Sequence, residues 1–142
     1  MVEMDNPDDT PLGLLLYRAS TVLRQEVSSV LRPLGLTLPD FVCMRHLAEV
    51  PGSSSAELAR TAGVTPQAMN TVLRRLEDDG LVSRPDTVAS GRALPANLTD
   101  KGQTLMKRAE LLVNGADERI LEKLDTGQQR EFKRMLSRLG SD

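Results

Sequence analysis

Hydrophobic residues in the first quarter of the chain recur at intervals of three and four positions, which is the spacing of an amphipathic helix. The stripe begins after Pro11 and consists of Leu12, Leu15, Leu16, Ala19, Val22, Leu23, Val27, Val30 and Leu31. An Arg-Pro-Leu-Gly run at 32–35 follows, and it should end the element because proline and glycine both interrupt helices. The sequence therefore predicts a long first helix with one apolar face.

Three shorter helices follow, each marked by the residues that begin and end it. Serine and threonine are favoured N-caps, glycine favours a helix end, and a first-turn proline loses no hydrogen bond. Pro39 and Pro66 fall in such first turns, and Ser54 and Glu57 have the spacing of a capping box. The predicted helices span 37–49, 55–62 and 66–79.

A change of pattern at residues 81–98 predicts a β-hairpin. Residues 81–84 favour one strand, the Ser90-Gly91 pair a turn, and residues 92–98 the returning strand. Pro95 cannot donate a hydrogen bond to a ladder, so the second strand should lie at an edge or contain a bulge.

Two further helices are predicted at the end of the chain. Thr99 can cap a long helix over 99–124, and Thr126 and Gln129 have capping-box spacing for a last one. Residues 1–9 are acidic with almost nothing apolar to bury, and they predict a disordered tail. The inward positions of the two helices are expected to be Leu105, Ala109, Leu112, Ala116, Ile120, Phe132, Met135, Leu136 and Leu139.

Residues 55–79 have the features of a helix-turn-helix, in which two helices cross steeply near a glycine-containing turn. Ala59 permits a close approach of the helices, and Gly63 permits a positive φ in the turn. The small core between the helices is expected to contain Val64, Met69, Val72, Leu73 and Leu76. With the hairpin that follows, the pattern is that of a winged helix-turn-helix.

The opposite face of the second helix in this motif has side chains that can read base edges. Gln67, Asn70, Thr71 and Arg74 recur at positions i, i+3, i+4 and i+7. Glutamine and asparagine can pair with adenine, arginine with guanine, and a threonine methyl can contact thymine. On an isolated helix a solvated polar face is the ordinary explanation, but the preceding turn and the following hairpin favour DNA recognition.

Four more residues are candidate DNA contacts. Thr65, at a helix N-terminus, suits a phosphate because free N–H groups and the helix dipole favour an anion there. Arg92, beside the predicted wing tip, can enter a minor groove, and a simple surface charge is the alternative. Arg75 and Arg84 can each contact phosphate or pair with one of the nearby acids Asp78, Asp79 and Asp86.

The net charge of −2, from 18 basic and 20 acidic residues among 142, first argues against a nucleic-acid partner. Its distribution removes the objection, because residues 60–76 contain Arg60, Arg74 and Arg75 and no acid. The total charge does not exclude DNA binding. It predicts a weaker hold on phosphates than a basic protein has, and a reliance on base contacts.

Composition excludes several other classes of protein. A chain with 39% hydrophobic and 27% charged residues is expected to fold, and no apolar run is long enough for a membrane span. The acidic N-terminus is unlike a secretory signal and predicts a cytoplasmic location. One histidine, one cysteine and no glycine-rich loop leave no catalytic triad, metal cluster or cofactor site, so we expect no enzyme. Cys43 lies in an apolar run and is expected to be an inert buried thiol.

The chain resembles the MarR family of transcriptional regulators over roughly residues 11–139. A Leu-Thr-x-x-Gly pattern at 98–102 is typical of the start of the fifth helix in that family. Ser90 stands where an aspartate is usual and Pro85 where a basic residue is common. The segments that carry the resemblance are 34–49, 54–84 and 91–102.

The resemblance implies a mainly α fold with a small β-hairpin wing. A winged helix-turn-helix DNA-binding lobe is expected at 37–98, and a helical dimerisation region at 10–36 and 99–142. The expected protein is a homodimeric repressor on a palindromic operator in double-stranded DNA, with recognition helices about 34 Å apart. Apolar stripes at both ends of the chain, too broad for a small monomer to cover, independently favour a dimer.

The resemblance also implies release from DNA by a small aromatic or phenolic acid bound where the dimerisation region meets the lobe. Two of the candidate effector residues, Phe41 and His46, can instead be ordinary packed residues with no role in binding the acid. The alternative function is a ligand-binding or protein-interaction module on the same dimeric scaffold without operator binding. The candidate effector residues are Tyr17, Arg18, Phe41, Arg45 and His46.

Overall fold

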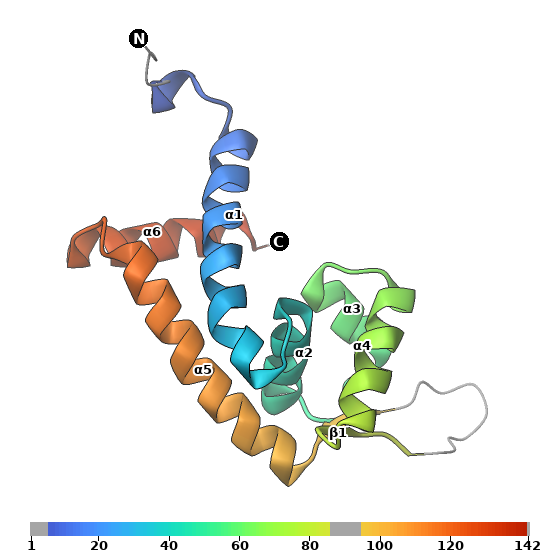
Figure 1. The fold of residues 1–142 in the computed structure, drawn as a ribbon. Helices are drawn as coiled ribbons and strands as arrows, with labels where there is room; N and C mark the ends of the chain where they lie inside the picture. Colours follow the sequence, from blue (N-terminus) through green and yellow to red (C-terminus); the bar gives the residue numbers. More distant parts are fainter. Residues whose placement is uncertain (1–5, 86–94, 142) are drawn as a thin grey trace.

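The computed structural model describes residues 6–85 and 95–141, and Figure 1 shows a helical chain with one small hairpin. The α-helices are α1 (Leu12–Leu31), α2 (Leu38–Glu49), α3 (Ser55–Ala62), α4 (Pro66–Asp78), α5 (Asp100–Leu121) and α6 (Thr126–Leu139). The remaining elements are the strands β1 (Val82–Ser83) and β2 (Asn97–Leu98) and the 3-10 helices η1 (Pro7–Asp9) and η2 (Arg32–Leu34). The predicted order of elements is confirmed. Within the described residues, no helix is both long and apolar enough to cross a bilayer.

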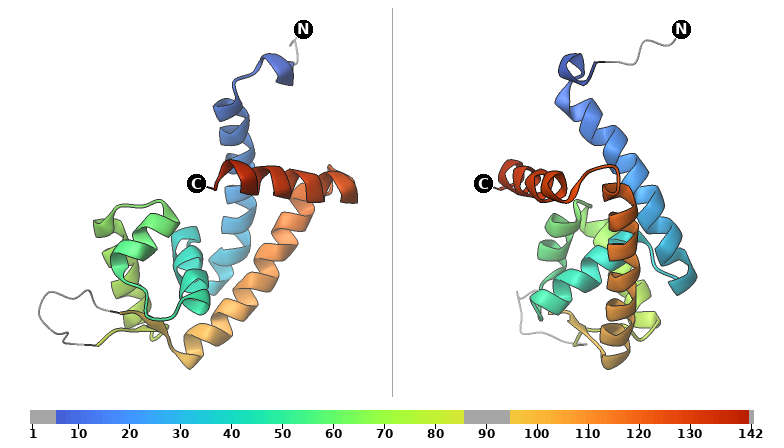
Figure 2. Two further views of the ribbon diagram at one scale, coloured as in Figure 1. Left: turned by 180° about the vertical axis from the view of Figure 1, so that it is seen from behind. Right: turned by 90° about the vertical axis from the view of Figure 1, so that its left-hand side faces the viewer.

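Two long helices support a lobe built from the shorter elements. α1 and α5 pack along each other, and α2, α3, α4 and the hairpin lie to one side of them (Figures 1 and 2). α2 contacts α1 and α5 as well as α3 and α4, so it joins the long helices to the lobe. The apolar core is continuous across this junction, with Leu31, Met44, Leu73 and Ala109 all fully buried. The lobe and the long helices therefore share one continuous core.

The hairpin ladder is short, and a third segment of the chain pairs with it. Val82 pairs with Leu98 and Ser83 with Asn97 in antiparallel register. Ala96 forms an isolated bridge with Ser53, just before α3, and no local pattern in the sequence predicts this bridge. The ladder of β2 begins two residues after Pro95, whose nitrogen cannot donate a hydrogen bond. The predicted turn lies outside the described residues.

Several helix ends differ from the prediction. The capping box of α6 is formed by Asp125 and Gln128 rather than by Thr126 and Gln129. Gln129 instead donates to the carbonyl oxygens of Leu121 and Leu124, and α5 ends at Leu121, three residues earlier than predicted. These side-chain bonds satisfy the last carbonyl of α5 and one carbonyl in the turn that follows it.

The caps at the other helices also depart in detail. Ser54 accepts from the backbone of Glu57 as predicted, whereas a reciprocal capping box is present at α2, between Thr37 and Asp40. Near the N-terminus, Pro7–Asp9 form a 3-10 helix where a disordered tail was predicted. Asn6 accepts from the backbone N–H of Asp8 and the proline restricts φ, which together order this segment.

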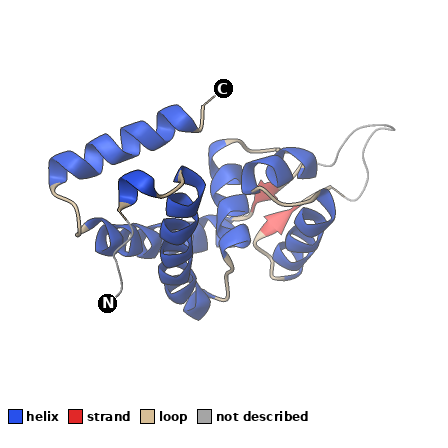
Figure 3. Ribbon diagram, turned by 90° about the horizontal axis from the view of Figure 1, so that it is seen from above, coloured by secondary structure: helices blue, strands red, loops and turns tan. Residues whose placement is uncertain are grey.

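α6 does not bury its apolar side. It lies beside the other helices, along one side of the molecule (Figure 3), and has no buried residue. Phe132, Met135, Leu136 and Leu139 are between 37% and 67% exposed, so the prediction that they face inward is wrong within one chain. Among the described residues, α6 makes no extensive contact with any other helix, so one chain alone does not cover its apolar side.

Candidate DNA interface and effector pocket

The turn between α3 and α4 has the geometry that the sequence predicted. Gly63 has a φ of 66° and ends α3, and the backbone N–H of Val64 donates to the carbonyl of Ala59 over 3.1 Å. Ala59 is 3% exposed, which allows the close approach of the helices. The buried side of α4 consists of Met69, Leu73 and Leu76, each at most 1% exposed. α4 is thereby fixed across α3 with its polar side outward.

The polar side of α4 presents the predicted base-reading set, which we call the recognition face: Gln67, Asn70, Thr71 and Arg74. Asn70 is half-buried and the other three are exposed. Thr65 is the N-cap of α4, and its hydroxyl accepts from the backbone N–H of Ala68 over 3.1 Å. Pro66 then leaves one fewer free N–H in the first turn. The DNA roles of these residues stay predictions, but the structure places them together on one surface.

The remaining predicted DNA contacts are placed differently. Arg75 donates to Asp40, and Arg84, whose side chain is only 14% exposed, donates to Glu77. Neither arginine pairs with the acids expected from the sequence, because Asp40 belongs to α2 and Glu77 to the last turn of α4. Arg92 lies outside the described residues.

The start of α5 is joined tightly to the end of α4. Thr99 donates through its hydroxyl to the carbonyl of Gly80 over 2.6 Å, and Lys101 donates through Nζ to the carbonyl of Asp79 over 2.8 Å. The backbone N–H of Thr99 donates to the carbonyl of Leu81 over 3.0 Å. A Cβ atom on Gly102 would lie 2.1 Å from that same carbonyl oxygen. This contact gives a physical reason for the glycine in the Leu-Thr-x-x-Gly pattern.

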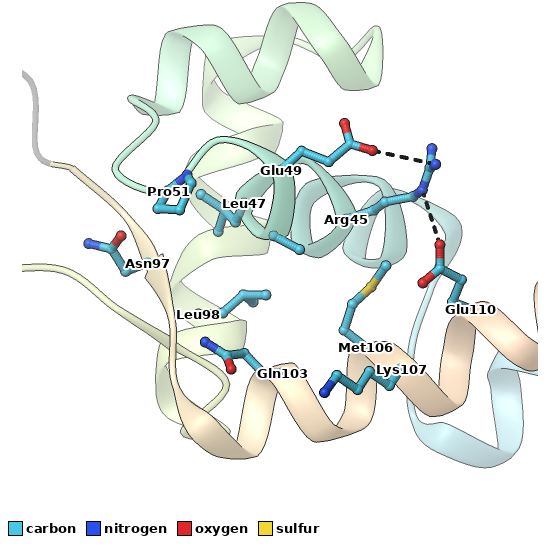
Figure 4. Close-up of a pocket in the computed structure, with 11 residues that line it drawn as sticks. Arg45, Leu47, Glu49, Pro51, Asn97, Leu98, Gln103, Met106, Lys107 and Glu110 are labelled. Carbon is cyan, nitrogen blue, oxygen red and sulfur yellow. Dashed lines mark ion pairs between the residues drawn. The ribbon is translucent and has the colours of Figure 1, made fainter.

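A pocket of about 450 Å³ lies between α2, α5 and β2 (Figure 4). Its apolar lining includes Leu47, Leu98 and Met106, and the side-chain amides of Asn97 and Gln103 supply polar groups. The charged residues of the lining are Arg45, Glu49, Lys107 and Glu110. The pocket therefore combines an apolar wall with charged groups at the meeting point of the long helices and the lobe.

Arg45 is already paired with carboxylates of the chain. Its Nη2 lies 3.4 Å from Glu49 and its Nε lies 3.7 Å from Glu110 (Figure 4). Lys107 has no ion-pair partner within the part of the chain that the structure describes. Of the two cations in the pocket, Lys107 is therefore the one available to an incoming anion.

The structure does not bring the five predicted effector residues together. Arg45 lines the pocket, whereas Tyr17 is 65% exposed in a separate shallow groove on α1. Arg18 is exposed on the same helix, Phe41 belongs to the core, and His46 is half-buried on α2. An effector role for each stays a prediction.

Cys43 is buried and 1% exposed, in agreement with the expectation of an inert thiol. Burial, with a smaller contribution from the negative charge of Asp40, raises the pKa of its thiol to about 12. Because the thiolate is the reactive form, Cys43 stays protonated and unreactive near neutral pH.

Asp40 and Lys107 are two site residues that the sequence did not predict. Asp40 follows Thr37 by three positions, and this spacing is a signal for its capping role. No local pattern connects it with Arg75, 35 residues later. Lys107 is an ordinary exposed lysine in the sequence, and only the packing of α5 against α2 places it at the pocket.

Comparison with known proteins points to one family. The sequence model of the MarR family matches residues 34–93. The chain is 67% identical over 135 residues to the HTH-type transcriptional repressor Rv2887 of Mycobacterium tuberculosis, covering 95% of this chain and 97% of that protein.

Two solved structures of that relative are also similar to the chain. Its complex with DNA has a TM-score of 0.82 at 62% identity, covering 94% of this chain and 100% of the other. Its complex with salicylic acid has a TM-score of 0.80 at 65% identity, covering 95% and 100%.

Proposed function

The chain belongs to the MarR family of helix-turn-helix transcriptional regulators, and we propose that it represses transcription as a homodimer bound to a palindromic operator. Binding of a small aromatic acid releases the dimer from this operator. The observation that carries the proposal is the recognition face on α4. Four side chains able to read base edges share this surface, next to the N-terminus of α4. The relative whose structure contains DNA supports DNA as the partner.

Exposed apolar residues at one end of the molecule support the homodimer. They lie on α1, α5 and α6, away from the recognition face (Figure 2). A second copy can cover these residues by a two-fold arrangement, in which each chain supplies the same surface. The residues are Leu12, Leu14, Leu16, Tyr17, Val22, Leu111, Leu112, Phe132, Met135, Leu136 and Leu139. Two-fold symmetry then requires an operator with two inverted half-sites.

The pocket between α2, α5 and β2 is the proposed site of the acid. An aromatic ring fits against Leu98 and Met106, the carboxylate reaches Lys107, and the amide of Gln103 can bond a phenolic hydroxyl. The relative solved with salicylic acid supports an acid of this class. The acid releases DNA only if it prefers a conformation that fits the operator poorly. A pocket between the long helices and the lobe suits this requirement, because its shape depends on their relative position.

A mobility-shift experiment tests the proposal. The probe is a duplex spanning the DNA immediately upstream of the chain's own gene, at low salt, with a scrambled duplex of equal composition as control. We expect a specific shift that salicylate weakens, and a dimeric mass by light scattering. No shift of the upstream duplex contradicts operator binding, and a shift unaffected by salicylate and related acids contradicts the proposed effector class.

Lys107→Gln tests the effector site. Without the cation the carboxylate loses its charge partner, so the salicylate concentration needed for half-release should rise about tenfold or more. Operator affinity without the acid should stay within about twofold, because Lys107 lies outside the recognition face. Lys123→Gln, an exposed lysine beyond the end of α5, is the matched control. Equal acid sensitivity of the two variants would place the effector elsewhere.

A further inference from the structure

Asp40 joins the beginning of α2 to the recognition helix. Its carboxylate is buried, with the side chain 1% exposed, while that of Arg75 is 45% exposed. Oδ1 accepts from Nη2 of Arg75, and Oδ2 accepts from the backbone N–H of Thr37 over 2.8 Å. Each carboxylate oxygen thus has a donor, one from the cap of α2 and one from the last turns of α4.

The bond matters because a buried carboxylate is costly without a partner. A buried charge is retained in a protein when it is paired and hydrogen-bonded, and removing one partner leaves the other uncompensated. α2 in turn is packed against α1 and α5. The Asp40–Arg75 pair therefore ties α4 to the part of the lobe that is fixed on the long helices.

Two neighbouring arginines on α4 are used differently. Arg74 is exposed and has no acidic partner among residues 6–85 and 95–141, whereas Arg75 is held by Asp40. Successive residues on a helix point about 100° apart, because 3.6 residues complete a turn. Arg74 therefore faces outward with the recognition face while Arg75 turns toward α2.

We propose that Arg75 is a positioning residue, which sets the position of α4 through Asp40 and supports operator binding without contacting a DNA phosphate. The inference rests on the DNA-binding function proposed above and replaces the phosphate contact predicted for Arg75 from the sequence. Arg84 is tied to α4 through Glu77 in a similar manner.

Asp40→Asn tests whether Arg75 positions α4 or contacts phosphate, because the two roles predict opposite changes in operator affinity. The asparagine oxygen can still accept from the backbone of Thr37, so the cap of α2 is kept while the charge that holds Arg75 is lost. If Arg75 contacted phosphate, removing a competing carboxylate would release it and tighten operator binding. If Arg75 positions α4, binding to the upstream duplex should weaken about tenfold.

Arg75→Gln adds a second readout, the dependence of affinity on salt. Losing one phosphate contact per subunit lowers the slope of log affinity against log salt by about 0.9 per contact. Loss of a positioning residue lowers affinity with the slope unchanged. Arg74→Gln is the matched control at the adjacent position, and it should lower the ratio of affinity for the upstream duplex to that for a scrambled one.

The double variant Asp40→Asn with Arg75→Gln distinguishes a loss of positioning from a general loss of folding in the single variants. Two amides can form an uncharged hydrogen bond, so the double variant should melt higher and bind more tightly than either single variant, with the wild-type salt slope. Tighter binding by Asp40→Asn, or a reduced slope in Arg75→Gln or in the double variant, overturns the proposal while the operator function stands. A wild-type chain that shifts no duplex overturns both.

Discussion

Replacing Gly102 with alanine should lower the melting temperature by about 10 °C or more, since a clash with backbone is among the few causes of large destabilisation. The added Cβ would lie 2.1 Å from the carbonyl oxygen of Leu81 and 3.3 Å from the side chain of Leu98. The oxygen cannot rotate away, because it accepts from the backbone N–H of Thr99. The joint between α4 and α5 must therefore open or shift. Thermal melting followed by circular dichroism measures the effect.

Gly115→Ala is the control for this prediction, since it lies on the same helix. A Cβ on Gly115 would have only the end of the Arg119 side chain nearby, at 3.8 Å. Alanine is the better helix former, so the melting temperature should stay the same or rise by a few degrees. If Gly102→Ala melts as the control does, the close contact at Leu81 does not constrain the joint.

Replacing Arg74 with alanine should weaken binding to the upstream duplex by at least about 30-fold. A bidentate arginine–guanine pair contributes about 1–3 kcal/mol, and a dimer on two half-sites loses the pair twice. The melting temperature should stay near that of the wild type, because the side chain is exposed and its removal opens no cavity. Titration of a labelled duplex by fluorescence anisotropy measures the affinity.

Arg108→Ala is the control for Arg74. Arg108 is an exposed arginine on α5, away from the recognition face, so its loss removes one positive charge without touching the proposed interface. Its operator affinity should change by less than about threefold at moderate salt. An equal loss of operator affinity in the two variants would mean that Arg74 contributes only its positive charge. Wild-type affinity in Arg74→Ala would contradict the assignment of the recognition face.

Local signals predicted most of the fold. Ser54, Thr65 and Thr99 each cap the helix that was expected from them, because a cap depends on residues three positions apart. The positive φ of Gly63 and the buried side of α4 follow from spacing in the same way. These features depend on neighbours in sequence, which is why the sequence alone predicted them.

What the sequence did not predict depends on residues far apart in the chain. The Asp40–Arg75 bond, the Ser53–Ala96 bridge and the position of Lys107 at the pocket all arise from packing between elements. The apolar side of α6 is an opposite example. Its spacing correctly indicated a helix with one apolar side, but spacing does not say whether the partner belongs to the same chain.

The tight joint at Gly102 has a consequence for the proposed dimer, in which each α5 serves as a lever arm. With 22 residues, α5 is about 33 Å long. Because Thr99 and Lys101 fasten its first turn to the end of α4, the lobe must follow the arm. A tilt of roughly 6° at the far end of such an arm displaces the lobe by about 3.4 Å, which is one base-pair step along DNA. A small change where the two chains meet would therefore shift a recognition helix out of register with its half-site.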